Sequence, residues 1–148
     1  MKKIIDKNLY LGEMKADTRG SVTFFNNLKL AGVKRFYQVS NSAKEPIRAF
    51  HGHMIEEKYV YVVSGKVLLC TVKLNSAVNP SKKNKVKKYL LSSENPQIIH
   101  VPAAHANGFK SLEKNSKVIF FSTLKLSDSV KDDYRYPFDY WGKEVWNI

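Results

Sequence analysis

The chain has a single cysteine, Cys70, so it cannot close an internal disulfide or carry the paired cysteines of a zinc or redox motif. A reducing, cytoplasmic compartment fits this usage, and Cys70, which lies in the apolar run 59–72, is expected to be a small buried hydrophobic side chain. Long apolar stretches are also missing, since no run approaches the ~20 residues of a membrane span. Residues 1–11 mix lysines with short apolar pairs and have no signal-peptide core. These absences predict a cytoplasmic protein with no membrane contact.

Helical periodicity is scarce as well. No window of eleven or more residues combines apolar positions at i, i+3, i+4 and i+7 with good capping residues. The apolar runs are instead short and rich in β-branched and aromatic residues, with Gly, Pro, Asn and Ser between them. They cover residues 22–25, 33–39, 59–63, 67–74, 89–91, 97–101 and 117–123. Ser64-Gly65 is a strong hairpin signal. We expect an all-β sandwich or barrel, in one domain over residues 1–148.

Acidic residues are few beside the basic ones: 13 Asp and Glu against 25 Lys and Arg give a formal net charge of +12. The densest cluster comprises Lys82, Lys83, Lys85, Lys87 and Lys88. It lacks interleaved aromatic residues and no nucleic-acid-binding signature accompanies it, so no nucleic-acid partner is predicted. Two interpretations stay open for it: a solvated hairpin loop, or part of a positive field that attracts a phosphorylated substrate.

The last segment, residues 127–148, differs in character from the rest of the chain. It combines four aspartates with three tyrosines, one phenylalanine and both tryptophans, Trp141 and Trp146. Such large side chains are typical of packed rather than disordered segments. We expect this segment to fold back on the barrel, with room for one short helix.

The strongest motif is His51-Gly52-His53. Side chains alternate along a strand, so these two histidines can point into one cavity. A polar segment, a strand and Gly65 follow, and Pro102 begins a second motif that ends near Asn107. This layout resembles the two motifs of the cupins. The resemblance implies a cupin jelly-roll barrel, here with an aromatic-rich C-terminal segment.

The departures from the metal-binding cupins are informative. Lys58 stands where the metal-binding carboxylate would fall, and Asn107 stands where the third metal-binding histidine would fall. A lysine ammonium repels a divalent cation, so we expect a protein without metal or other cofactor. The alternative is that Glu56, Glu57 and His105 supply ligands in a shifted register.

A metal-free cupin with this lysine resembles the dTDP-4-dehydrorhamnose 3,5-epimerase family. The matching features are Asp17-Thr-Arg19-Gly20, Arg48-Ala-Phe-His51, Lys58 and Asn107-Gly108-Phe109. A second, overlapping resemblance is to the dTDP-4-keto-6-deoxyhexose 3,4-ketoisomerases, through Lys34-Arg35-Phe36-Tyr37 and His51-Gly52-His53. Both imply an isomerase that acts on a nucleotide-diphosphate 4-keto-6-deoxy sugar in bacterial surface-polysaccharide biosynthesis. A non-catalytic or metal-dependent sugar-binding cupin is the remaining alternative.

The chemistry on a 4-keto sugar assigns the roles. His51 is the candidate base for the proton beside the ketone, and Lys58 or His53 would stabilise the resulting enolate. Tyr37 is the first candidate for the acid, with Tyr134 or Tyr136 next, because Phe120, Phe121 and Leu126 occupy the region of the family's usual tyrosine. The carboxylate partner that the family gives its histidine would be Asp133 or Asp139.

Substrate binding follows from the same resemblance. Arg19 and Arg48 match the family's positions for the diphosphate, a group that arginine binds well through paired hydrogen bonds. Asn107, Tyr134 and Arg135 are further substrate-binding candidates. The resemblance also implies a homodimer that pairs through β-strands.

Overall fold

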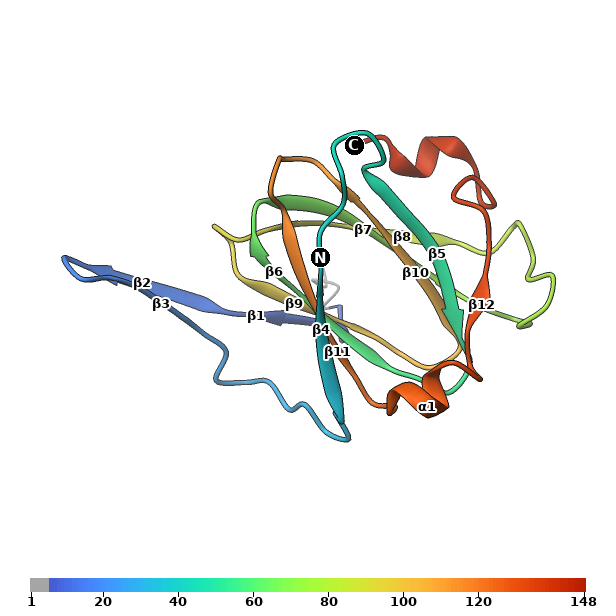
Figure 1. The fold of residues 1–148 in the computed structure, drawn as a ribbon, viewed down its shortest axis with the longest axis horizontal. Helices are drawn as coiled ribbons and strands as arrows, with labels where there is room; N and C mark the ends of the chain where they lie inside the picture. The colour runs from blue at the N-terminus through green and yellow to red at the C-terminus, as the bar shows by residue number, and fades with distance from the viewer. Residues whose placement is uncertain (1–5) are drawn as a thin grey trace, which may run out of the picture.

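The computed structural model describes residues 6–148 and contains two facing antiparallel sheets of five strands each (Figure 1). The first sheet has the order β1 (Leu9–Leu11), β9 (Gln97–Val101), β6 (Lys58–Ser64), β11 (Lys117–Ser122) and β4 (Arg35–Val39). The second has the order β12 (Tyr134–Arg135), β5 (Ile47–His53), β10 (His105–Ser111), β7 (Lys66–Lys73) and β8 (Val86–Ser92). The prediction of an all-β jelly-roll barrel is confirmed.

Three smaller elements complete the chain. Strands β2 (Glu13–Asp17) and β3 (Gly20–Phe24) form a hairpin that projects far from the barrel (Figure 1). A single helical turn, α1 (Leu126–Ser129), follows β11, and a 3-10 turn, η1 (Lys143–Trp146), lies near the C-terminus. Among residues 6–148, no helix is long and apolar enough to cross a membrane.

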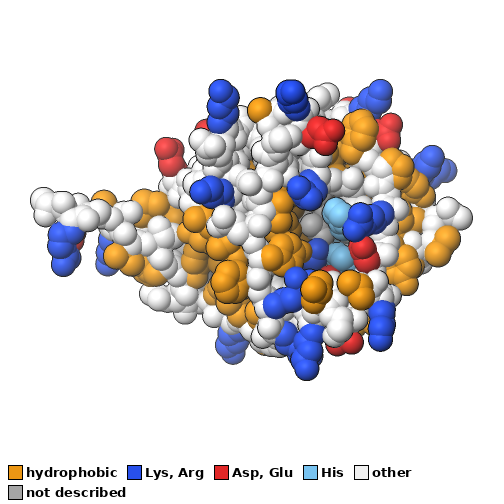
Figure 2. Space-filling model, in the orientation of Figure 1, with side chains coloured by type: hydrophobic (Ala, Val, Ile, Leu, Met, Phe, Trp, Pro, Cys, Tyr) orange, Lys and Arg blue, Asp and Glu red, His pale blue; other side chains and the backbone are white. Residues whose placement is uncertain are grey.

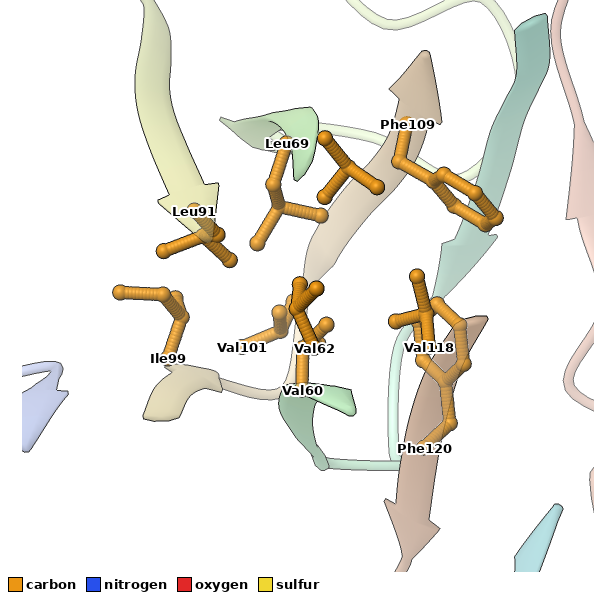
Figure 3. Packing of buried hydrophobic residues seen from close by; sticks show 10 residues of the cluster. Val60, Val62, Leu69, Leu91, Ile99, Val101, Phe109, Val118 and Phe120 are labelled. Carbon is orange, nitrogen blue, oxygen red and sulfur yellow. The ribbon is translucent and has the colours of Figure 1, made fainter. Parts of the chain in front are cut away.

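The main core fills the space between the two sheets. Its buried side chains come from alternate positions of the facing strands, as the two-residue period of a strand requires (Figure 3). They are Val60, Val62, Val67, Leu69, Leu91, Ile99, Val101, Phe109, Val118 and Phe120. Each such side chain contributes roughly 1.5–3 kcal/mol by leaving water, so this interior keeps the two sheets together.

A second core lies on the outer face of the second sheet, where the aromatic C-terminal segment packs. Trp141 contacts Phe50 edge to face, with 4.9 Å between ring centroids, and Trp146 lies 5.3 Å from the same ring. Both indole N–H groups are satisfied: that of Trp141 donates to the Ser81 carbonyl (3.0 Å) and that of Trp146 to the Phe138 carbonyl (2.8 Å). The predicted return of the tail onto the barrel is confirmed.

Each of the predicted apolar runs overlaps a strand, and Gly65 forms the β6–β7 turn with a φ of 80°, which favours glycine. Strands β1, β2, β5, β10 and β12 were not predicted from apolar runs, and the clearest cases are β2 and β10. Their sequences, EMKAD and HANGFKS, hold few β-formers. Their strand conformation comes from their neighbours, since β10 pairs along its length with both β5 and β7.

Candidate active site

A hollow of about 150 Å³ lies between the edge strand β4 and strand β5. Its lining residues are Tyr37, Val39, Arg48, His51, Lys58, Asn107, Phe109 and Phe120. Figure 2 shows histidine side chains in a hollow of this face, surrounded by basic and acidic side chains.

A bulge in the β5–β10 pairing sets this arrangement. Asn107 pairs with His51 and Phe109 pairs with Arg48, so three steps along β5 match two along β10. The extra residue lets Arg48 and His51 line one hollow although they are an odd number of residues apart. The bulge therefore places a cationic side chain and an imidazole side by side.

His51 is the half-buried imidazole of the hollow. Burial, followed by the charges of Lys58 and Arg135, lowers its pKa to about 4, so the ring is neutral at neutral pH. The Asp133 carboxylate lies 3.9 Å from its Nδ1. Of the two carboxylates considered, only Asp133 approaches His51; Asp139 is exposed further along the tail.

Lys58 is the cation of the hollow. The residue is only 6% exposed, and this burial lowers its pKa to about 8. Its Nζ lies 5.5 Å from the centre of the Phe120 ring and 5.9 Å from that of Tyr37. An ammonium among aromatic faces is poorly solvated, which strengthens its attraction for any negative charge that forms nearby.

Tyr37 forms one wall. Its ring stacks on that of Phe120, with 5.3 Å between centroids and 11° between planes. Burial raises the pKa of the phenol, and the nearby Glu56 carboxylate raises it further. The hydroxyl therefore keeps its proton at neutral pH and can act as a donor.

His53 lies behind the hollow in a buried polar network. Its Nδ1–H donates to the Asp132 carbonyl (2.7 Å) and lies 3.1 Å from Glu56 Oε2. Burial and the charge of Lys58 lower the pKa of His53. Its Nε2 is buried and has no hydrogen-bond partner among residues 6–148. His53 is thus held in a fixed tautomer, with one nitrogen available.

Glu56 is the centre of this network. Its carboxylate accepts hydrogen bonds from the hydroxyls of Ser122 and Ser129 and lies 3.5 Å from the Arg35 guanidinium. The sequence offered Glu56 only as a shifted metal ligand. The structure shows it beside His53, three residues earlier in the chain. Its other partners come from distant parts of the sequence, which local patterns do not reveal.

Asp132 fixes the turn after His53, and sequence reasoning missed it. Its carboxylate accepts the backbone N–H groups of Met54, Ile55 and Glu56 at 2.8–2.9 Å. No local signal could have found this role, because the contact spans 76 to 78 positions of the chain.

A wider hollow of about 570 Å³ adjoins the first, and Arg48, His51 and Arg135 line it. The Arg48 guanidinium donates to the Asn41 side chain (3.2 Å), and that of Arg135 donates to Asp133 (3.2 Å). Two guanidinium groups thus border the wider hollow, and one of them, that of Arg48, also lines the small one.

Four further candidates lie in different places. Asn107 lines the hollow, is 3% exposed, and has an Oδ1 without a partner among the described residues. Arg19 lies on the projecting hairpin with 89% of its side chain exposed, and pairs with Asp17 at 2.7 Å. Tyr134 packs against the second core, as does Tyr136, whose hydroxyl donates to the Ala77 carbonyl. The structure therefore brings neither tyrosine, nor Arg19 of the same chain, to the hollow.

The structure does not bring Glu56, Glu57 and His105 together as the ligands of an alternative metal site. Glu57 pairs with His100 at 2.7 Å, Glu56 lies in the network described above, and His105 lines a separate cavity. Within residues 6–148, no group of three or more histidine, cysteine or acidic side chains is arranged to hold a metal ion.

Comparison with known proteins points to one family. The chain is 27% identical over 112 residues, 72% of each protein, to the spore coat polysaccharide biosynthesis protein SpsL of Bacillus subtilis. A dTDP-4-dehydrorhamnose 3,5-epimerase from Bacillus anthracis, solved with TDP and PPi bound, superposes with a TM-score of 0.76 at 21% identity, over 99% of this chain and 90% of that one. A 3,4-ketoisomerase from Helicobacter canadensis gives 0.66 at 16% identity, over 93% and 95%.

The family match covers nearly the whole chain. The sequence profile of the dTDP-4-dehydrorhamnose 3,5-epimerases matches residues 3–135, a span that includes both strands with the histidine and lysine of the hollow. The chain therefore belongs to the dTDP-4-dehydrorhamnose 3,5-epimerase family.

Proposed function

We propose that this protein epimerises a dTDP-linked 4-keto-6-deoxy sugar by removing a proton beside the ketone. One observation carries the proposal: a neutral imidazole, His51, and a buried ammonium, Lys58, line the same small hollow. A base and a cation in one poorly hydrated space suit the formation of an enolate. The family match and the SpsL relative favour a role in the synthesis of a surface-polysaccharide sugar.

The steps follow from the lining. His51 takes the proton from the carbon next to the ketone. The electron pair of that C–H bond forms the C=C bond of the enolate, and the π pair of the carbonyl moves onto the keto oxygen. Lys58 stabilises this oxygen as an enolate, in surroundings where one fixed charge is worth ~3 kcal/mol or more. Tyr37 then returns a proton to the opposite face of the carbon, because its raised pKa keeps the phenol protonated until it is needed.

Nucleotide binding is assigned to the rim. Arg48 and Arg135 lie where the catalytic hollow meets the wider one, so a diphosphate there would leave the sugar directed toward His51. Asn107, with its unpartnered Oδ1, would accept a hydrogen bond from a sugar hydroxyl.

A 3,4-ketoisomerase is the second candidate. His53 favours it, since its Nε2 is buried without a partner and a second imidazole could move a proton between neighbouring carbons. The removal of the first proton by His51 would be the same in both reactions, and only the carbon that receives the proton would differ.

The test is to incubate the protein with dTDP-4-keto-6-deoxyglucose in D₂O and to locate deuterium by NMR. Label at C3 alone indicates a single-site epimerase, and label at both C3 and C5 a 3,5-epimerase. A 3-keto product indicates the isomerase. If no label enters and no product forms, the protein is a non-catalytic sugar-binding cupin and the proposal fails.

The matched variant is His51→Asn. It should slow C–H exchange by ~10²–10⁴-fold, as expected for loss of a general base, while dTDP affinity changes by less than about twofold. Binding should persist because the nucleotide contacts are assigned to Arg48 and Arg135. Exchange at the wild-type rate would remove His51 from the mechanism.

We further propose that the protein is a cytoplasmic homodimer. The single cysteine, Cys70, is buried, which suits a reducing compartment. Arg19 lies exposed on the projecting hairpin, outside the hollow of its own chain. In a dimer, this hairpin could bring Arg19 to the diphosphate bound by a second copy.

A further inference from the structure

A larger cavity, of about 610 Å³, opens at the opposite edge of the barrel from the catalytic hollow. The catalytic hollow lies beside β4 and β5, whereas this cavity is bordered by β8 and by Lys7 and Asn8, which precede β1. Strands β4 and β1 are the two outer edges of the first sheet, and β5 and β8 lie toward opposite edges of the second. The two spaces therefore have separate openings.

The lining of the second cavity is strongly basic. Four lysines border it, from the start of the chain (Lys7), the end of β7 (Lys73) and β8 with the loop before it (Lys85, Lys87). Asparagine amides, the hydroxyl of the buried Thr71 and the imidazole of His105 add neutral polar groups. Lys85 and Lys87 belong to the lysine cluster for which the sequence left two interpretations open: a solvated loop, or part of a positive field that attracts a phosphorylated substrate.

The positive charge is not neutralised nearby. Asp6 is the carboxylate closest to these lysines in the described structure: it lies 3.7 Å from Lys87 and accepts a hydrogen bond from the Tyr89 hydroxyl at 2.6 Å. This carboxylate pairs with only one of the four lysines that border the cavity. The excess positive charge also affects His105: burial lowers the pKa of its imidazole, and the charges of Lys73 and Lys87 lower it further.

The chemistry of the lining selects the ligand. No Phe, Tyr or Trp borders the cavity, so it offers no stacking surface for a nucleobase, and its lysines act as point charges suited to phosphate oxygens. Its size falls within the range of small-molecule sites. We propose that this cavity is a second anion site, which binds a compact phosphate anion with several charges, of the diphosphate type, independently of the catalytic hollow.

The test uses inorganic pyrophosphate as the probe, titrated calorimetrically into the full-length protein at low ionic strength. The double variant Lys73→Gln/Lys85→Gln should weaken the cavity's share of the binding, which persists in Arg48→Gln, by about tenfold or more, because two of the four cavity charges are removed. The charge-matched control Lys83→Gln/Lys117→Gln removes two exposed lysines outside the cavity, and should change the affinity by less than about twofold.

A third variant, Arg48→Gln, tells the two sites apart. It should leave the cavity's pyrophosphate binding unchanged, while the Lys73→Gln/Lys85→Gln protein should keep its rate of deuterium exchange on the sugar. The proposal is overturned if Arg48→Gln alone abolishes pyrophosphate binding. It is also overturned if the two lysine pairs weaken binding equally, which would be a general charge effect, or if the wild type binds no pyrophosphate.

Discussion

At the scale of single residues, burial sets the protonation of the site. The same loss of solvation lowers the pKa values of both His51 and Lys58, because both groups are cations when protonated. At neutral pH His51 is nevertheless neutral and Lys58 is charged, since their pKa values of about 4 and about 8 lie on either side of neutrality. At neutral pH a neutral imidazole therefore lies near a lysine ammonium, and each group is in the protonation state that its own pKa favours.

These pKa values predict a bell-shaped pH profile of kcat/KM for epimerisation. The low-pH limb should fall through about pH 4, where His51 gains a proton and can no longer act as base. The high-pH limb should fall through about pH 8, where Lys58 loses the charge that stabilises the enolate. Initial rates measured from about one pH unit below the His51 pKa to about pH 10 check this.

The control for that profile is Lys58→Gln. Its plateau rate should be ~10²–10³-fold lower, as when one donor to a developing oxyanion is removed, and the limb near pH 8 should disappear. A variant that keeps this limb would show that another group titrates there. A low-pH limb near 6.5 would mean that His51 is more solvated than its position indicates.

At the scale of elements, the C-terminal segment has two functions. Its tryptophans cover the outer face of the second sheet, and its earlier part carries Asp132 and Asp133 to β5. Strand β12 fixes this placement by pairing Arg135 with His51 and Tyr134 with Gly52. The segment that packs on the sheet also places the Asp133 carboxylate beside the imidazole of His51, the proposed base.

Trp146→Ala tests how strongly this segment is held. Trp146 is 2% exposed, packs on Phe50 and donates its indole N–H, so its removal should lower the free energy of unfolding by about 3–5 kcal/mol. The melting temperature should fall by roughly 10 °C for a chain of this size. Urea unfolding followed by circular dichroism measures the change.

Phe138→Ala is the matched control within the same segment. Its side chain is 42% exposed, and its backbone carbonyl, which accepts the Trp146 indole N–H, is retained. The expected loss is below about 1 kcal/mol. Equal destabilisation by the two variants would contradict the packing role assigned to Trp146.

At the scale of the whole molecule, the β2–β3 hairpin of a single chain pairs with no further strand among residues 6–148. Strands β2 and β3 extend from the barrel, every residue of β2 is exposed, and Arg19 lies in the connecting turn (Figure 1). A two-stranded ribbon alone is only marginally stable in water, which favours a second copy that packs against it.

Mixed dimers test whether Arg19 serves the partner's site. Arg19→Gln and His51→Asn should each be weakly active alone. In a mixed dimer with exchange in trans, one site would contain both wild-type residues, so random pairing should restore about a quarter of the wild-type activity. Light scattering should show a dimer throughout. No gain on mixing, or a monomer at micromolar concentration, would contradict the arrangement.

The sequence by itself determined the class of fold and pointed to the residues proposed for the chemistry. Short β-branched and aromatic runs predict strands because their side chains suit a half-buried pleated surface, and this signal is local. The spacing of His51 and His53 is local too, and so is the replacement of a metal-binding carboxylate by Lys58. Family membership followed from the order of such motifs along the chain.

Only the tertiary structure decided which distant residues meet. Asp133 rather than Asp139 lies beside His51, Tyr37 rather than Tyr134 or Tyr136 lines the hollow, and Arg19 lies outside it. These outcomes depend on strand register, on one bulge and on packing between segments up to about eighty residues apart. No local pattern encodes them, because burial and long-range pairing exist only once the two sheets have closed on each other.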